Sequence, residues 1–294
     1  MYDYLIIGIG IAGLAAAEEI RKNDENGKIL IVSKEEIPTY WRTRLSALIA
    51  KDFNKDDIHV KKDAWYQEKN IEEKLDTEVE KLDLENNKAI LANGEEIEYG
   101  KVLLATGARA FVPPIKNVES KGVFAIRSLD DLISFKEYAA DKKEVVIIGG
   151  GILGLEAAFS VKKLGKEVSV IEAADYILNR QLDHELSKKL EKSLNEMGIK
   201  TFTGKATEEI LANDGKVSGI KLSNGEEIKA DVIMVQAGVR SIIDLAKNSN
   251  LEVDRGIIVN DNLQSKKENV YAAGDCAQIG NFTIGLWTAS QEMG

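Results

Sequence analysis

Two short stretches of the sequence carry three glycines at one shared spacing. They are Gly8, Gly10 and Gly13 in the first stretch, and Gly149, Gly151 and Gly154 in the second. At this spacing the first glycine permits a tight turn, the second lets the backbone approach a pyrophosphate, and the third allows a helix to pack closely on a strand. A helix that begins at such a turn presents unpaired N–H groups to phosphate oxygens. The two stretches therefore predict two dinucleotide-binding turns.

The residues on either side of the glycines supply the elements that this motif needs. The stretches read YLIIGIGIAGLAAA over 4–17 and VVIIGGGILGLEAA over 145–158. Each places an apolar run of β type before the glycines and an alanine-rich helical pattern after them, and this context is what makes the motif specific. We predict a strand over 3–8, a helix over 11–23 and a second strand over 28–33.

A glutamate follows the second strand of each copy, about 20 residues past the glycines, where dinucleotide-binding units recognise a ribose. In the second copy VSVIE ends at Glu172 and two alanines follow, so a 2′-phosphate would meet a carboxylate and no cation. NAD(H) is therefore favoured over NADP(H). In the first copy Ser33 ends the strand, and Glu35, slightly later, is the ribose candidate. At both positions a solvated glutamate is the alternative.

A second repeat follows the first. LANGEEIEYGKVLLATG (91–107) aligns without a gap to LSNGEEIKADVIMVQAG (222–238), and in each an Asn-Gly turn joins two alternating segments before an apolar strand. Because the hairpins are separated by nearly the same distance as the glycine motifs, two copies of one domain plan explain both repeats.

The sequence thus predicts an α/β fold of two Rossmann-like, three-layer dinucleotide-binding domains, the second inserted in the first. A chain of 294 residues suits two domains. We expect the first domain at 1–113 plus 239–294 and the second at 114–238, with Pro113 and Pro114 in the linker. The segment after 238 reads as strand, turn, strand and helix start, so we expect it to complete the first domain.

Composition limits the partners and the compartment. The formal charge of −10 argues against nucleic acid and anionic membrane surfaces. Cys276 is the only cysteine, so no disulfide forms within the chain, and MYDYLIIG lacks the pattern of a signal peptide or a membrane span. We expect a cytoplasmic protein.

Two further motifs give the arrangement a family likeness. LLATG (103–107) closes the first unit and VYAAGDCAQ (270–278) returns to it. With the two glycine motifs they resemble the FAD-dependent pyridine nucleotide–disulfide oxidoreductase superfamily. The resemblance implies FAD in the first domain and NAD(H) in the second, with the nicotinamide reducing the flavin.

The resemblance also implies individual site residues. For FAD they are Gly8, Gly10, Ile11, Ala12, Gly13, Glu35, Arg42, Arg44, Val79, Ala105, Thr106, Gly107 and Asp275. For NAD(H) they are Gly149, Gly151, Ile152, Leu153, Gly154, Glu172 and Gly238. Asp275 would contact the ribityl or pyrophosphate portion of FAD, with a simple N-cap as the alternative. The catalytic candidate is Glu156, implied near the nicotinamide–flavin contact in a positioning or electrostatic role. Its alternative is a first-turn glutamate stabilised by the helix dipole.

The sequence lacks the cysteines through which many relatives pass electrons. There is no CxxxxC pair, and Thr43 stands where a related group has its single redox cysteine. YWRTRL (40–45) resembles instead the corresponding segment of NADH:rubredoxin oxidoreductases and of the flavin part of assimilatory nitrite reductases. In that likeness Arg42 and Arg44 face the flavin or its phosphates, unless they are exposed helix-start arginines. Tyr40 and Trp41 either flank the flavin or belong to the core.

We therefore expect an NADH-dependent flavoprotein reductase that passes electrons to a small redox protein such as rubredoxin. The alternatives are the flavin module of a nitrite-reductase-like enzyme and a non-catalytic module that senses NADH or scaffolds a partner. No His, Cys or carboxylate spacing indicates a metal site, and His59 and His184 are expected to be structural. The chain ends at Gly294, where relatives continue into a C-terminal interface domain. This domain is expected to be absent, either because the chain is truncated or because its natural form is short. The oligomeric state is left open.

Overall fold

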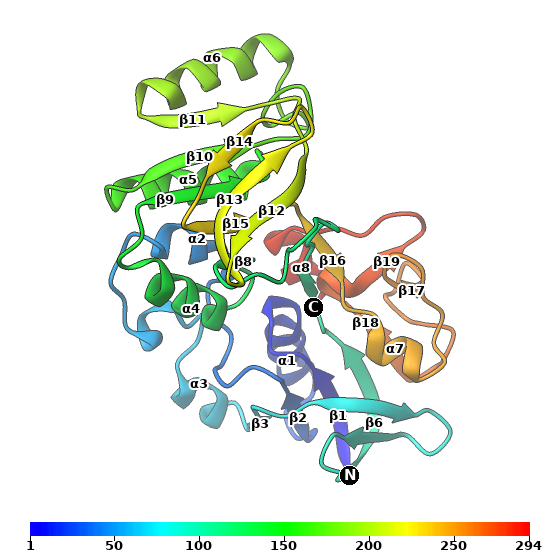
Figure 1. The fold of residues 1–294 in the computed structure, drawn as a ribbon. Coiled ribbons are helices and arrows are strands. Elements are labelled where there is room, and N and C mark those ends of the chain that lie inside the picture. The colour runs from blue at the N-terminus through cyan, green and yellow to red at the C-terminus, as the bar shows by residue number, and fades with distance from the viewer. The chain divides into compact units, whose positions relative to one another are not determined.

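The computed structural model describes residues 1–294, and the backbone forms two compact units (Figure 1). The first unit comprises Met1–Trp41, Asn54–Arg109 and Val239–Gly294; the second comprises Arg42–Phe53 and Ala110–Gly238. Each unit is built on its own parallel sheet, which confirms the predicted α/β class with two Rossmann-like halves. Two segments differ from the expected division, because residues 42–53 and residues 110–113, expected in the first domain, group with the second unit.

The first unit has a parallel sheet in the order β3-β2-β1-β6, and β18 returns from the C-terminal part of the chain to pair with β6. A meander, β4 and β5, continues antiparallel to the N-terminal part of β6. The strands are β1 (Tyr2–Ile7), β2 (Ile29–Val32), β3 (Ile71–Lys74), β4 (Val79–Asp83), β5 (Lys88–Leu91), β6 (Glu96–Leu104), β7 (Ala108–Ala110), β16 (Val239–Ser241), β17 (Ile257–Val259), β18 (Val270–Ala272) and β19 (Ala277–Ile279).

Helix α1 (Ile11–Asn23) covers the sheet of the first unit with small residues. Ala12, Gly13, Ala16 and Ala17 are all buried, which lets the helix axis approach the strands closely. The end of the helix is held by Arg21, whose guanidinium donates to four backbone carbonyls, among them those of residues 69 and 70. The other helical segments of this unit are η2 (Lys55–Ile58), α3 (Asp63–Glu68), α7 (Asp244–Asn248), η3 (Gly274–Cys276) and α8 (Trp287–Met293).

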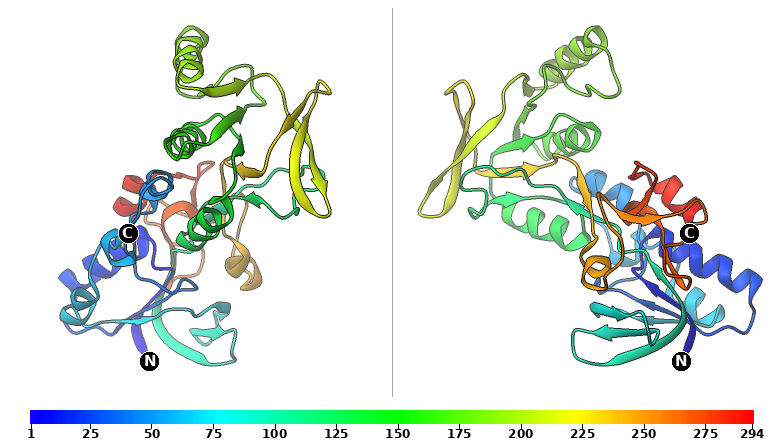
Figure 2. Two further views of the ribbon diagram at one scale, coloured as in Figure 1. Left: turned by 60° about the vertical axis from the view of Figure 1, so that its left-hand side comes forward. Right: turned by 90° about the vertical axis from the view of Figure 1, so that its right-hand side faces the viewer.

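The second unit repeats this plan. Its parallel sheet has the order β11-β10-β9-β15-β8, and a three-stranded antiparallel meander follows, β12-β13-β14. Helices α5 and α6 lie on one face of the sheet and the meander lies on the other (Figure 2). The strands are β8 (Val123–Phe124), β9 (Glu144–Ile148), β10 (Glu167–Ile171), β11 (Ile199–Phe202), β12 (Thr207–Asn213), β13 (Lys216–Leu222), β14 (Glu227–Lys229) and β15 (Val232–Val235). The helices are η1 (Arg42–Arg44), α2 (Leu45–Leu48), α4 (Leu129–Ala139), α5 (Ile152–Lys163) and α6 (His184–Glu196).

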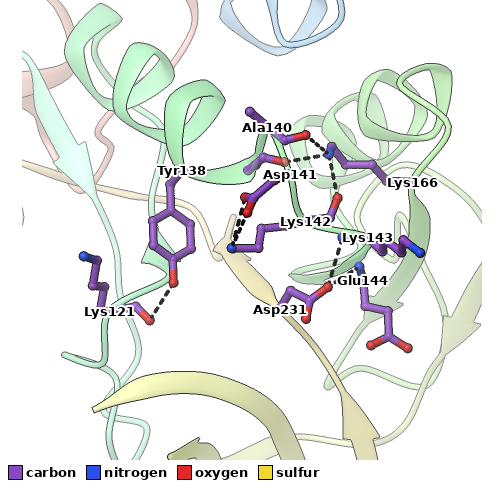
Figure 3. Close-up of polar contacts among 10 residues, drawn as sticks. Lys121, Tyr138, Ala140, Asp141, Lys142, Lys143, Glu144, Lys166 and Asp231 are labelled. Atoms are coloured by element: carbon purple, nitrogen blue, oxygen red, sulfur yellow. Dashed lines mark hydrogen bonds and ion pairs between the residues drawn. The ribbon is translucent and has the colours of Figure 1, made fainter. Parts of the chain in front are cut away.

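A buried lysine fixes the approach to strand β9 (Figure 3). The ammonium of Lys166 donates to the carbonyls of Ala139 and Lys142, at 2.6 and 2.7 Å, and so satisfies carbonyls at the C-terminal end of α4. The carboxylate of Asp231 accepts from the N–H groups of Lys143 and Glu144, both at 2.9 Å. These contacts anchor the start of the strand that leads into the second glycine motif.

No helix of the chain combines the length and apolarity needed to cross a bilayer.

Candidate functional site

The first glycine motif forms a tight turn between β1 and α1. Gly8 has φ of +110°, and a Cβ there would lie 2.2 Å from the carbonyl oxygen of Ala105. A Cβ on Gly13 would lie 2.1 Å from the carbonyl oxygen of Gly8. At Gly10, however, a Cβ would meet no atom within 4 Å, and no side chain caps the helix that begins there. The turn is therefore packed on its inner side and open at a helix N-terminus, which fits a phosphate.

The second glycine motif repeats this geometry between β9 and α5. Gly149 has φ of +120° and would place a Cβ 2.3 Å from the carbonyl oxygen of Gln236, while a Cβ on Gly154 would lie 2.0 Å from that of Gly149. Gly151 again has no atom within 4 Å of its Cβ position, and no side chain caps α5. The two turns thus offer the same open cradle to a pyrophosphate.

Glu172 lies directly against the second turn. One carboxylate oxygen accepts from the N–H of Gly150 at 2.7 Å, and the other accepts from the N–H of Ala174 at 2.8 Å. These bonds hold the carboxylate at the end of β10, and each oxygen keeps a further lone pair. This position and orientation suit an acceptor for ribose hydroxyls.

The end of β2 in the first unit is arranged differently. Ser33 is buried, and its hydroxyl accepts from the N–H of Glu35 at 3.1 Å. The carbonyl of Glu35 accepts from the N–H of Asp76 at 3.2 Å, so the backbone of this loop is tied to the connection between β3 and β4. Glu35 is partly exposed. A carboxylate is therefore present near the strand end, two residues later than in the second unit.

The strand that ends LLATG lies beside the first turn. The N–H of Ala105 donates to the carbonyl of Ile7 at 2.8 Å. Thr106 donates its hydroxyl to the carbonyl of Ile242 at 2.9 Å, and the N–H of Ile242 returns a bond to Gly107 at the same distance. Gly107 has φ of +70° and open space at its Cβ position, as has Gly238, the equivalent residue of the second unit, with φ of +99°. Val79, by contrast, points its side chain into the core of the first unit.

Asp275 lies in η3 and is held from two sides. Its carboxylate accepts from the hydroxyl of Ser290 at 3.1 Å, and its carbonyl accepts from the hydroxyl of Ser241 at 2.6 Å. It is the N-cap of neither η3 nor α8, so the simple capping role considered from the sequence is wrong. The bonds to Ser241 and Ser290 connect distant parts of the chain and carry no signature in the sequence.

Cys276 has the environment of a structural thiol. The side chain is fully buried, and its S–H donates to the carbonyls of Leu104 and Ala273, both at 3.3 Å. Burial raises the pKa of the Cys276 thiol, which keeps it protonated at neutral pH. A protonated, inaccessible thiol without a second cysteine cannot run disulfide exchange.

The first turns of the two helices differ in exposure. In α1 Ile11 is half-buried and Ala12 is buried, whereas in α5 Ile152 and Leu153 are 49% and 46% exposed. Glu156 is exposed further along α5. The first turn of α5 holds no acidic residue, so the view of Glu156 as a first-turn, dipole-stabilising glutamate is wrong.

The YWRTRL segment is divided between the units. Tyr40 is buried in the first unit, and Trp41 stacks on Trp287 with ring centroids 5.3 Å apart. Arg42 and Arg44 belong to the second unit, where the guanidinium of Arg42 donates to the carbonyl of Arg127 at 2.7 Å and α2 packs on α5. The structure therefore does not gather the two arginines with the other FAD candidates in one compact unit.

Neither histidine belongs to a cluster of possible metal ligands. The ring of His184 contacts Tyr176 edge-on at 5.5 Å between centroids, and the backbone of His59 pairs with Tyr40. No three or more His, Cys, Asp or Glu side chains come together in an arrangement that could hold a metal ion.

Sequence reasoning missed two donors to the glycine turns. The hydroxyl of Thr39 donates to the carbonyl of Ile9 at 2.6 Å, and the N–H of Leu178 donates to that of Gly150 at 3.0 Å. Both come from the loop after the second strand of their unit. No motif in the sequence identifies Thr39 or Leu178 as a donor, since both bonds depend on how the loop folds back onto the glycine turn.

Comparison with known proteins places the chain among the pyridine nucleotide-disulphide oxidoreductases. The pyridine nucleotide-disulphide oxidoreductase family model matches residues 2–294. The chain is 36% identical over 284 residues to a nitrite reductase (NAD(P)H) of Bacillus subtilis, covering 96% of the chain and 35% of that protein. It is 32% identical over 282 residues to the rubredoxin–NAD(+) reductase of Pseudomonas putida, covering 96% and 73%. The crystal structure of a ferredoxin reductase from Rhodopseudomonas palustris matches with a TM-score of 0.93 at 30% identity, covering 99% and 74%.

These matches confirm the likeness drawn from the sequence motifs. The chain spans about a third of the length of the nitrite reductase and nearly three quarters of the rubredoxin reductase. The chain belongs to the pyridine nucleotide-disulphide oxidoreductase family, whose members are oxidoreductases that use FAD and NAD(H).

Proposed function

We propose that the chain takes electrons from NADH through FAD to a separate small redox protein of the rubredoxin kind. The observation that carries this proposal is the pair of open glycine turns, one in each unit, combined with a single buried thiol. Two open glycine turns suit two dinucleotides, one that stays bound and one that binds and dissociates in each cycle. Because the only thiol is buried, the electrons must pass from the flavin to an external acceptor.

In this proposal the first unit holds FAD, which when bound accepts hydride from a nicotinamide and releases electrons onward. The turn at Gly10 and the start of α1 receive the pyrophosphate. Glu35 accepts from the adenosine ribose, and Asp275, fixed by Ser290, orients the ribityl or pyrophosphate portion. The backbones of Val79 and Thr106 line the same site.

The second unit then holds NADH. The turn at Gly151 receives the pyrophosphate, and Glu172 accepts from the adenosine ribose while its bonds to the turn keep it in place. A 2′-phosphate would be repelled by this carboxylate, which favours NADH over NADPH. The exposed Ile152 and Leu153 give the nicotinamide half an apolar surface, and Glu156 contributes positioning and local charge.

A second candidate is the flavin module of a nitrite-reductase-like enzyme. The 36% identity to the nitrite reductase, in which the chain spans only about a third of the length, favours it. Both candidates share the flow of electrons from NADH to FAD and differ in the acceptor. We place either activity in the cytoplasm, because a single buried cysteine forms no disulfide within the chain and so gives no support for secretion into an oxidising compartment.

The acceptor can be tested with the purified chain reconstituted with FAD. NADH is added together with oxidised rubredoxin, and the bleaching of the rubredoxin band is followed; a parallel assay offers a low-molecular-weight disulfide. We expect rubredoxin reduction, no disulfide reduction and no loss of rate in Cys276→Ser. Disulfide reduction that disappears in Cys276→Ser would overturn the proposal. Reduction of nitrite-reductase redox centres but not of rubredoxin would favour the second candidate.

A further inference from the structure

The carbonyl between the first and second glycines receives a donor in each turn. In the first unit this is Ile9, which accepts from the Thr39 hydroxyl at 2.6 Å; in the second unit it is Gly150, which accepts from the Leu178 N–H at 3.0 Å. The two carbonyls occupy the same position of the motif. One unit uses a side chain for this bond and the other uses the main chain.

The bond matters because a peptide plane rotates as one body. In a trans peptide the C=O and the following N–H point in opposite directions. A donor on the carbonyl of Ile9 therefore fixes where the N–H of Gly10 points, at the open start of α1. Glycines flank Ile9 on both sides and give the backbone unusual freedom at this point.

Thr39 is itself held by a buried chain of hydroxyls. Ile9, Thr39 and Tyr66 are 4%, 2% and 1% exposed, and the Tyr66 hydroxyl donates to the Thr39 oxygen at 3.3 Å. Burial raises the pKa of Tyr66 to about 12, so its hydroxyl keeps the proton that it donates. With that bond made, the proton of Thr39 is directed at Ile9.

We infer that Thr39 is a positioning residue for the first glycine turn, aiming the Gly10 N–H at the phosphate of the dinucleotide with support from Tyr66. The inference rests on the proposed function for the identity of the ligand, FAD. In the second unit the same orientation depends on Leu178, held at φ of +49°, and no side-chain substitution can remove that donor.

The test compares Thr39→Val, which keeps the shape and removes the hydroxyl, with Thr39→Ser, which keeps the donor. FAD affinity of the apo chain is measured by quenching of flavin fluorescence. We expect Thr39→Val to bind FAD about tenfold or more weakly, the size of one lost hydrogen bond to a buried carbonyl. Thr39→Ser should stay near wild type, and Tyr66→Phe should fall between them.

The matched control is Ser249→Ala, because Ser249 is another buried hydroxyl of the first unit that donates to a carbonyl, that of Leu245 at 2.7 Å. It should lower the melting temperature without changing FAD affinity. A merely structural Thr39 would behave in the same way. Thr39→Val binding FAD within twofold of a binding wild type would overturn the inference.

Amide hydrogen exchange separates this inference from the proposed function, since it needs no ligand. In the apo chain, Thr39→Val should speed exchange in the peptide over residues 5–17 about tenfold and leave the peptide over 145–158 unchanged. Unchanged exchange at 5–17 would overturn the positioning role even if FAD binds. A wild type that binds no FAD, with the exchange effect present, would instead contradict the proposed function alone.

Discussion

Valine at the middle glycine of each motif should remove one cofactor and spare the other. Gly10 and Gly151 have extended backbone angles that any residue adopts, φ of −68° and −79°, and no atom lies within 4 Å of either Cβ position. We therefore expect Gly10→Val and Gly151→Val to fold, with unfolding free energies within about 1 kcal/mol of wild type. The side chain instead fills the space through which a pyrophosphate approaches the backbone.

The expected loss follows from the bonds that are blocked. Losing two charge-assisted N–H bonds to phosphate, each about 1.5–3 kcal/mol, amounts to about 3 kcal/mol or more. At 1.4 kcal/mol for each factor of ten, this weakens the cofactor about 100-fold or more. Gly10→Val should purify without the flavin spectrum and still bind NADH, measured by NADH fluorescence. Gly151→Val should keep its flavin, with NADH reducing it about 100-fold more slowly at subsaturating concentration, measured by stopped flow.

Each variant is the matched control of the other, because both make the same substitution at the same position of the repeat. Exchanged outcomes would refute the assignment of the cofactors, since FAD would then belong to the second unit. Two variants that both keep both cofactors would refute it as well, since the open space at the turns would then have no part in binding.

Three further substitutions test the roles of Glu172, Glu73 and Lys166. Glu172→Ala removes the ribose acceptor and leaves the N–H groups of Gly150 and Ala174 unbonded, so the KM for NADH should rise about 10-fold or more and the KM for NADPH should rise less; an equal rise for both would contradict the assigned contact. Burial, and more weakly the charge of Asp63, raise the pKa of Glu73 from 4.5 to about 7. The folded state therefore holds the proton of Glu73 more tightly than the unfolded state, so the free energy of unfolding is highest below pH 4.5 and falls as the pH rises through about 7. Glu73→Gln should accordingly raise the free energy of unfolding by about 1–2 kcal/mol at pH 8, after allowing for its partial exposure, and by little at pH 4.5, as measured by urea denaturation; equal effects at both pH values would refute the assignment. Lys166→Met leaves the carbonyls at the end of α4 without their donor and should lower the free energy of unfolding by about 2–3 kcal/mol, whereas a change below about 0.5 kcal/mol would show that water replaces the ammonium.

Local patterns were enough to predict the frame of both units. The helix predicted over 11–23 is α1 with the same bounds, and the Asn-Gly turns fall between β5 and β6 and between β13 and β14. These features depend on residues close together in the sequence. Glycine spacing, alternation and turn chemistry therefore carry them.

The features that could not be predicted depend on contacts between distant segments. Thr39 reaches Ile9, and Ser290 reaches Asp275, only because loops fold back on the sheet. The short helix α2 joins the second unit because it packs on α5, although its sequence neighbours belong to the first. Hydroxyl hydrogen bonds and packing of this kind produce no regular pattern of residues in the sequence from which they could be predicted.

The most direct test of the electron path is an anaerobic titration of the purified chain with NADH, followed in the visible spectrum. We expect the absorption bands of bound FAD, their bleaching by about one equivalent of NADH, and much slower bleaching by NADPH. A chain that binds no flavin, or whose flavin stays oxidised in excess NADH, would contradict the proposal that the two turns serve one transfer of hydride.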